Sequence, residues 1–361
     1  MSAIIDQTRP DQTRPDQTRP DQNYGLSLLK IWMSFEVVLA HCWHSKNVKG
    51  LFFFLFKNSR GLAVPVFMFT AFILTGKYII GRNKQKISAR LNRLFIMQFS
   101  WAVIYTVFFA LSAVLLNKGM FAGKSFAHVL MMFAGQIIFG HTVNATMWFQ
   151  ADLIFITAMF AFIFFKFTDK TAITLTCVCV VVAFVLQYSE INYILFGNLH
   201  RYLKYTPGRF CEMLPTACAG LLFVRYGLAE KLQARRKFVI LMCTVIFVSA
   251  FILRMITGSD TPRGFGYAGI YLNVFAISVT IMFMMMPLKN LPASIKCVIG
   301  NISRFTPGVY CMHRLTALCL EFLTGREFDS FGGCIVIYIT CIAVSFLLSL
   351  FFRKSGKYLV A

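Results

Sequence analysis

Runs of apolar residues of membrane-spanning length recur along the chain, and polar residues gather between them. Eleven such segments stand out, near 26–45, 61–81, 94–116, 126–140, 146–165, 171–188, 210–224, 238–257, 267–287, 305–323 and 333–352. An α-helix needs about 20 predominantly apolar residues to cross a bilayer, and a spanning helix satisfies its own backbone hydrogen bonds. The pattern therefore predicts an all-α polytopic membrane protein with one membrane domain over residues 26–352.

The fourth segment, FAHVLMMFAGQIIFG, has only fifteen residues and contains a histidine and a glutamine. That length suits an interfacial or re-entrant helix better than a span. With the N-terminus in the cytoplasm, Lys and Arg are in the majority on the cytoplasmic side only if 126–140 does not cross. We therefore predict about ten transmembrane helices plus one interfacial or re-entrant helix, with both termini cytoplasmic. The basic loop at 46–60 goes against the charge rule in either case.

The ends of the chain are polar. Residues 6–20 repeat DQTRP three times, and a proline at every fifth position excludes a helix in a stretch with almost nothing apolar to bury. We expect residues 1–25 to be a disordered cytoplasmic tail and 353–361 a short basic one.

The formal net charge of +22 first raises nucleic acid as a partner. The basic residues lie in short loops, however, where they set topology and touch membrane lipids of negative charge. We expect no nucleic acid partner. The eleven cysteines are scattered, mostly inside apolar runs and without a CxxC motif, which predicts neither a disulfide framework nor a metal site.

The first apolar segment, LLKIWMSFEVVLAHCWH at 28–44, carries four ionisable side chains: Lys30, Glu36, His41 and His44. Lys30 and His41 are eleven positions apart, about 20° past three full helical turns, so they share one face roughly 16 Å apart along the axis. Glu36 lies about 120° from both, which predicts a different neighbour for it. Ionisable residues inside a membrane usually face the protein interior and carry function.

Other ionisable residues fall within the later segments: Asp152, Glu212 and His313. A histidine with carboxylates at the same depth has the composition of a general-base site. Plainer interpretations stay open, because Lys30 could anchor a helix end and the two carboxylates could be interfacial caps or ion-pair partners.

Arg90 and Arg93 are three positions apart at the cytoplasmic start of the third segment. Such a pair can bind phosphate groups. It can equally be a positive-inside anchor of that helix.

Three stretches resemble a known family, the membrane-bound acyltransferases of the acyltransferase 3 type. LLKIWMSFEVVLAHCWH is similar to the family's first helix, with Lys30 where the family usually has Arg. GLAVPVFMFTAFILTG resembles the family's Val-x-x-Phe-Phe-x-x-Ser-Gly-Phe stretch, with Thr70 for Ser and Ala71 for Gly, and the loop after it ends in Arg-x-x-Arg. ISRFTPGVYCMHRL is similar to the family's Ser/Thr-x-x-Ile-Tyr-Leu-x-His stretch near its penultimate helix.

The resemblance implies an O-acyltransferase of the bacterial inner membrane that acetylates a cell-surface glycan or its lipid-linked precursor. It implies acetyl-CoA as the cytoplasmic donor, His41 as the catalytic group, and Arg90 and Arg93 near the donor phosphates. A rival interpretation is a transporter or flippase for a lipid-linked sugar, in which His41, Glu36 and Asp152 relay protons.

Overall fold

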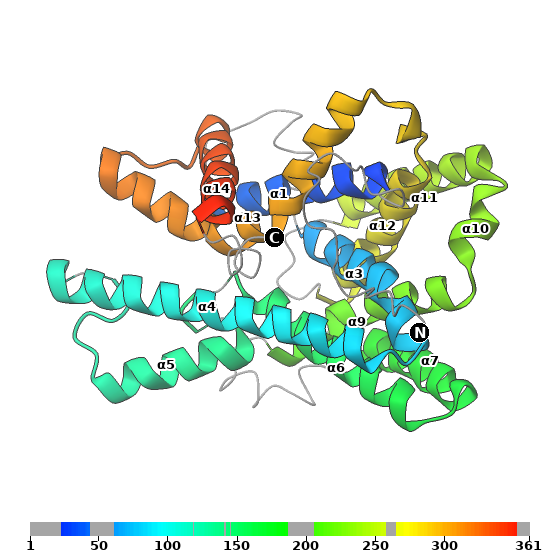
Figure 1. Ribbon diagram of the computed structural model, residues 1–361, viewed down its shortest axis with the longest axis horizontal. Coiled ribbons are helices and arrows are strands. Elements are labelled where there is room, and N and C mark those ends of the chain that lie inside the picture. The colour runs from blue at the N-terminus through cyan, green and yellow to red at the C-terminus, as the bar shows by residue number, and fades with distance from the viewer. Residues whose placement is uncertain are drawn as a thin grey trace, which may run out of the picture.

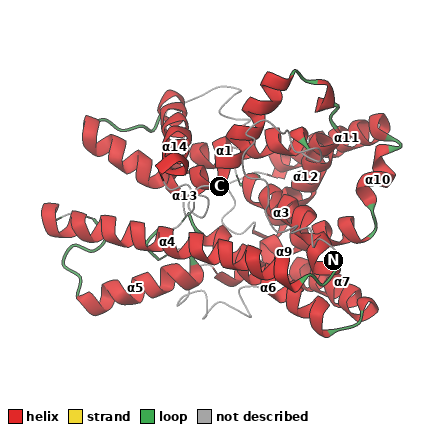
Figure 2. Ribbon diagram, viewed as in Figure 1, coloured by secondary structure: helices red, strands yellow, loops and turns green. Residues whose placement is uncertain are grey.

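The computed structural model describes residues 23–43, 61–117, 119–140, 142–144, 146–186, 206–257 and 265–351. Within these ranges the chain forms twelve α-helices and one short 3-10 helix, and no strand (Figure 2). The repeat tail, the basic loop at 46–60 and the basic C-terminal tail fall outside the described residues, as does His44.

The helices follow one another through the whole chain (Figure 1). They are α1 (Tyr24–Cys42), α3 (Ala63–Ile80), α4 (Lys84–Leu116), α5 (Phe126–Phe139), α6 (Trp148–Lys166), α7 (Asp169–Leu186), α9 (Thr206–Arg225), α10 (Leu228–Gln233), α11 (Arg236–Thr257), α12 (Phe265–Met285), η1 (Leu288–Asn290), α13 (Ala293–Thr324) and α14 (Phe331–Phe351). Each of the eleven predicted segments coincides with a helix, so the all-α prediction is confirmed.

Two helices begin well before their apolar segments. α4 starts at Lys84 because the side chain of Asn83 accepts a hydrogen bond from the Lys86 N–H at 3.0 Å and caps the first turn. α13 starts at Ala293, directly after Pro292. The first turns of both helices are polar, and hydropathy alone therefore missed them.

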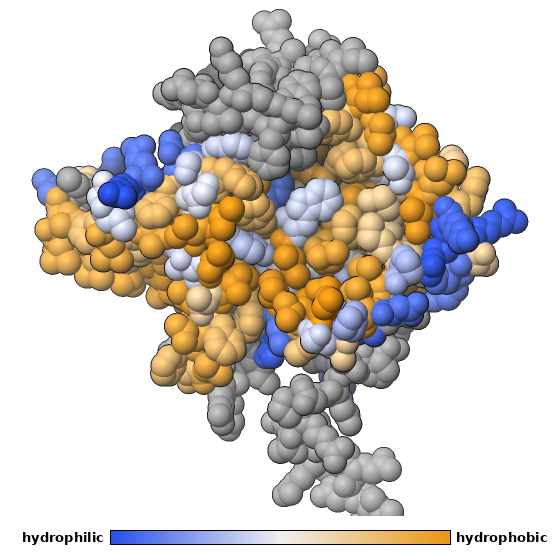
Figure 3. Space-filling view, turned by 90° about the horizontal axis from the view of Figure 1, so that it is seen from above, coloured by the Kyte–Doolittle hydropathy of each residue, from blue (hydrophilic) through white to orange (hydrophobic). Residues whose placement is uncertain are grey.

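Six of the described helices are long and apolar enough to cross a membrane: α1, α3, α4, α6, α11 and α14. Shorter apolar helices accompany them at Phe126–Phe139 and Leu272–Met285. Large apolar side chains lie exposed on the outside, among them Val114 and Phe351 at 82% and 80% exposure. Figure 3 shows apolar residues covering much of one face. Such a surface fits hydrocarbon and not water, and the protein is an integral membrane protein.

α5 and α6 lie one after the other along α4 (Figure 1). Gln98 and Phe99 of α4 contact Gln136 and Phe133 of α5, whereas the earlier α4 residues Leu94 and Lys84 contact Gln150 and Phe165 of α6. Both helices thus run antiparallel to α4 and in the same direction as each other. The predicted short helix exists, but it does not fold back on α6, as a re-entrant hairpin would.

A network of buried hydrogen bonds fills the break between α5 and α6. The Gln136 side chain accepts hydrogen bonds from the Val143 and Asn144 N–H groups at 2.7 and 2.9 Å. Its own amide donates to the Asn144 carbonyl at 3.3 Å. The Asn144 side chain in turn accepts from the N–H of Thr146 at 3.1 Å. Non-helical backbone is tolerated at membrane depth where protein groups satisfy it in this way.

Several helix ends meet at one end of the molecule. Arg82, in the turn between α3 and α4, donates to Asp169 at 2.7 Å and to the Phe167 carbonyl at 3.0 Å, both at the turn between α6 and α7. Arg225 at the end of α9 lies 3.5 Å from the same carboxylate. The exposure of these ion pairs makes them weak contributors to stability, but they show that the two turns lie side by side.

α1 and α13 pack in parallel. Near their starts, the Lys296 ammonium lies 5.8 Å from the Tyr24 ring centroid. Further along, the ring of His41 at the end of α1 contacts the ring of His313 in the middle of α13. The two contacts are separated by the same number of residues on each helix, so the helices stay in register. α14 runs antiparallel to α1, because Phe331 contacts Trp43 while Tyr338 bonds to Ser34.

The break between α5 and α6 depends on Gly140. Its φ of +71° lies in the left-handed region, and a Cβ there would come within 2.5 Å of the Met147 carbonyl oxygen. Gly140→Ala should destabilise the protein by roughly 1–3 kcal/mol beyond the strain of a positive φ, because backbone must move to make room. Thermal unfolding of the purified protein in detergent measures this.

Gly123→Ala is the matched control. Gly123 has almost the same φ of +69°, but nothing lies within 4 Å of its added Cβ. The two variants share the conformational strain, and only Gly140→Ala adds a clash. Equal unfolding temperatures for both would show that the break tolerates rearrangement.

Candidate active site

His41 and His313 lie together inside the bundle. Their ring centroids are 5.3 Å apart with an interplanar angle of 33°. His41 comes from the last turn of α1 and is half-buried, whereas His313 is completely buried in the middle of α13. The sequence singled out both residues as candidates, and the parallel packing of α1 and α13 brings them into contact.

The tautomer of His313 follows from its neighbours. Its Nδ1 lies 2.8 Å from the Tyr310 carbonyl oxygen and 3.2 Å from that of Val309. Carbonyl oxygens only accept hydrogen bonds, so Nδ1 carries the proton and Nε2 carries the lone pair. Nε2 is buried and has no hydrogen-bond partner within the described structure. A buried imidazole with an unused lone pair can accept a hydrogen bond from a group that enters the site.

α6 holds the stretch of α13 that carries His313. Gln150 donates to the Leu94 carbonyl of α4 at 2.9 Å, and its side-chain oxygen accepts from the Cys311 thiol at 3.5 Å. The Tyr310 hydroxyl donates to the Thr146 carbonyl, in the break before α6. Sequence reasoning missed Gln150 and Tyr310; the signals were a glutamine at the start of an apolar run and a tyrosine one helical turn before the histidine.

The predicted carboxylates lie on other helices. Asp152 is buried at 4% exposure in the first turns of α6, one turn beyond Phe149, whose ring packs against Tyr310. Glu212 is half-buried on α9, which begins at Thr206. The roles predicted for both carboxylates stay predictions, and the ring that contacts His41 is that of His313.

Glu36 has a structural partner. It is buried, and one carboxylate oxygen accepts the Gly61 N–H at 3.1 Å, just before α3 begins. The expectation that Glu36 serves a different neighbour from Lys30 and His41 agrees with this contact. The bond ties the middle of α1 to the entry of α3.

The side chains considered for donor binding lie on α1 and α4, and Lys30 lies nearer the start of α1 than His41 does. Lys30 is half-buried on the same face of α1. Arg90 is half-buried and Arg93 exposed in the early turns of α4, and a buried Nε of Arg90 has no partner within the described residues. Arg93 directly precedes Leu94, whose carbonyl accepts from Gln150, and the same glutamine accepts from the Cys311 thiol, two residues before His313.

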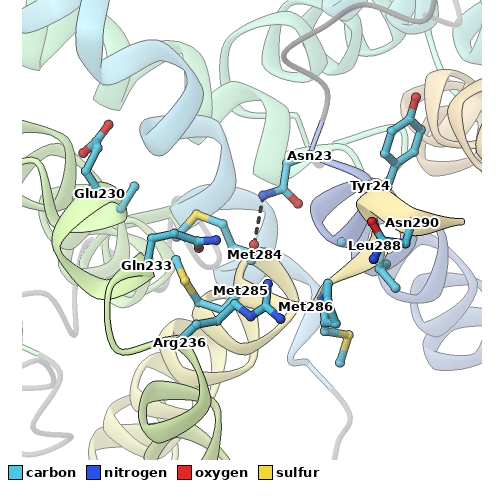
Figure 4. A pocket seen from close by; sticks show the side chains of 13 residues that line it. Asn23, Tyr24, Glu230, Gln233, Arg236, Met284, Met285, Met286, Leu288 and Asn290 are labelled. Carbon is cyan, nitrogen blue, oxygen red and sulfur yellow. Dashed lines mark hydrogen bonds between the residues drawn. The ribbon is translucent and has the colours of Figure 1, made fainter.

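A cavity of about 530 Å³ opens near the start of α1 (Figure 4). Asn23, which caps α1, donates to the Met284 carbonyl at 3.0 Å at its edge. Met284 to Met286 form an apolar side, and Arg236 and Glu230 bring one charge of each sign. The cavity thus carries no excess positive charge, unlike the Arg90–Arg93 pair.

A comparison with protein families decides what kind of protein carries this site. A family model described as an acyltransferase domain, of the acyltransferase 3 type, matches residues 23–352. The chain belongs to the acyltransferase 3 family. Searches of curated proteins and of solved structures found no match. The resemblance seen in the sequence is therefore confirmed, and the protein is a membrane acyltransferase.

The second family-like stretch lies on α3. α3 is unbroken from Ala63 to Ile80, so the chain continues as helix through Thr70 and Ala71. This outcome fits the loss of a glycine at Ala71, since glycine is the residue that favours a break. The Thr70 hydroxyl is buried without a hydrogen-bond partner among the described residues.

The histidine pair yields a direct test. His41→Gln and His313→Gln should each lower acyl transfer by roughly 10²–10⁴-fold, the usual contribution of general acid–base catalysis, while insertion and unfolding temperature change little. Turnover of acyl-CoA by purified variants measures the effect. His128→Gln, on α5, is the control and should keep wild-type turnover. Normal rates for both site variants would remove the histidines from the chemistry.

Proposed function

We propose that this acyltransferase moves an acetyl group from cytoplasmic acetyl-CoA to a hydroxyl of a cell-surface glycan or of its lipid-linked precursor, in the inner membrane of a bacterium. The observation that carries the proposal is the contact between His41 and His313, with an unused imidazole lone pair inside the bundle. Family membership supplies the class of reaction.

The chemistry balances without further reactants. A histidine of the pair takes the proton of the acceptor hydroxyl as its oxygen attacks the thioester carbonyl. The new C–O bond forms, the C–S bond breaks, and the thiolate of coenzyme A leaves and takes up a proton. His41 serves as general base, or as a transient acyl carrier on a two-step route. Asp152 or Glu212 orients its ring in this scheme.

The donor enters from the end where the turns of α3–α4 and α6–α7 meet. Arg90 and Arg93 bind its phosphates, because two guanidinium groups attract a polyanion more strongly than the charge-balanced cavity beside Asn23 does. That cavity lies about 10 Å along α1 from Lys30. Its apolar side and its balanced charges suit the uncharged part of the donor.

The same turns support the proposed topology. If α5 made a crossing of its own, the α3–α4 and α6–α7 turns would lie on opposite sides, but Arg82 and Asp169 join them. This supports ten spans with both termini in the cytoplasm, in which α5 and α6 together return along α4. Family membership favours an acyltransferase over the transporter alternative.

A purified-protein assay tests the function. Acetyl-CoA with an acceptor glycan should release free thiol and add acetyl mass to the glycan. Arg90→Ala with Arg93→Ala should raise the KM for acetyl-CoA about tenfold or more, since a hydrogen bond to a charged group contributes roughly 1.5–3 kcal/mol. The acceptor KM should change little.

Lys166→Ala with Lys170→Ala is the control for that variant. It removes the same number of positive charges, at the turn between α6 and α7, and should leave the donor KM unchanged. Accumulation of a lipid-linked sugar across vesicles without thiol release would favour the transporter instead.

Cysteine labelling tests the sidedness. Single cysteines at Lys84, Lys170 and Lys124, in a background without native cysteines, can be probed with an impermeant maleimide on intact spheroplasts. Lys124 lies before α5 and should be labelled, whereas Lys84 and Lys170 should react only after lysis. Opposite behaviour of Lys84 and Lys170 would mean that α5 crosses, and labelling of both from outside would reverse the donor path.

A further inference from the structure

Tyr105 of α4 reaches into the hydrogen-bond ladder of α13 beside His313. Its hydroxyl donates to the Cys311 carbonyl at 2.9 Å and accepts from the Leu315 N–H at 3.2 Å. These two backbone groups are four residues apart, the pair that bond to each other in a regular α-helix. The hydroxyl therefore bridges the turn of α13 that has His313 at its middle. Tyr105 itself is completely buried.

We propose that Tyr105 is a positioning residue that sets the orientation of His313; the idea rests on the proposed role of the histidine pair. A side chain that enters the ladder of a helix bends or widens it locally. The ring of His313 bonds back onto the carbonyls of Tyr310 and Val309 in the same stretch. The direction of its Nε2 thus depends on the shape of this stretch of helix.

A second feature of α13 is a backbone hydrogen bond lost at a proline, which makes a local distortion of the helix easier. Pro307 lies inside the helix and has no N–H to donate. The Ser303 carbonyl, which would have accepted it, accepts the Thr306 hydroxyl at 2.9 Å instead. From Ser303 to Leu315 the helix is thus held at several points by side chains, and the contacts from α4 and α6 determine its course.

Simple packing does not account for the hydroxyl. The Tyr105 ring already fills space between Trp101 and Phe109, with centroid distances of 6.1 and 6.5 Å. A phenylalanine would make the same ring contacts. The hydroxyl adds only the bridge to α13, so its removal isolates the positioning role from the packing role.

Tyr105→Phe tests the proposal. The ring should stay in place and leave the Leu315 N–H and Cys311 carbonyl without their bridge. We expect kcat to fall about tenfold or more, equivalent to about 1.4 kcal/mol, with the acetyl-CoA KM within twofold of wild type. Hydrogen exchange in a peptide spanning Cys311–Leu315 should become faster, while the start of α13 exchanges as before.

Tyr338→Phe is the matched control. It removes a half-buried tyrosine hydroxyl that bonds to Ser34 and to the Ile31 carbonyl on α1, on the α14 side. It should keep the wild-type kcat and the wild-type exchange of the Cys311–Leu315 peptide. Equal losses in the two variants, or a Tyr105→Phe enzyme that loses only thermal stability, would overturn the proposal.

Two further outcomes separate this inference from the proposed function. If wild-type protein turns over another acyl-CoA but not acetyl-CoA, the acetyl donor is wrong and the kinetic test proceeds with the donor that works. If Tyr105→Phe lowers activity equally in wild-type and His313→Gln backgrounds, Tyr105 acts independently of His313 and the positioning role is wrong.

Discussion

The parallel, in-register packing of α1 against α13 is the constraint on which the site depends. Both helices begin at the same end and run the same way, so His41 and His313 arrive at one depth although they lie far apart in the sequence. α14 packs along α1 in the antiparallel direction. A shift of one helix by a single turn would separate the two rings by about 5 Å along the axis.

The second requirement is that polar groups inside lipid find partners within the protein. In the break between α5 and α6, Gln136 satisfies this requirement, because its side-chain oxygen accepts hydrogen bonds from two backbone N–H groups. From there the bonds run through Asn144 and Thr146 to Tyr310, one turn before His313. The irregular backbone and the histidine are therefore parts of one buried polar cluster, and the shape of each depends on the other.

Sequence patterns predicted the elements well, because apolar content decides which segments become membrane helices. They also predicted His41 and His313 as candidates, since ionisable residues inside apolar runs are conspicuous. Their contact was beyond prediction, because it requires the relative register of two helices. The role of Tyr105 was not predicted for a different reason. A tyrosine in an apolar helix is typical of a packing residue, and only the structure shows that its hydroxyl bonds to the backbone of α13. The joint return of α5 and α6 along α4 likewise depends on tertiary contacts.

The position of His41 along α1 bears on how donor and acceptor meet. It lies roughly 27 Å from Asn23 along the helix axis, close to the thickness of a hydrocarbon core of about 30 Å. Between them, Ser27, Lys30 and Ser34 fall within about 60° of one another on the helix, so a polar stripe follows α1 from the cavity end to the histidine pair. A helix that served only as a membrane anchor would have no need of such a stripe. Ser34 of this stripe is buried and bonds to the Ile31 carbonyl and to the Tyr338 hydroxyl, so its polar group is satisfied inside the protein. If the proposed function holds, a donor that enters at the cavity end has to reach along most of α1 to His41, and the acceptor would travel only a short distance from the other side.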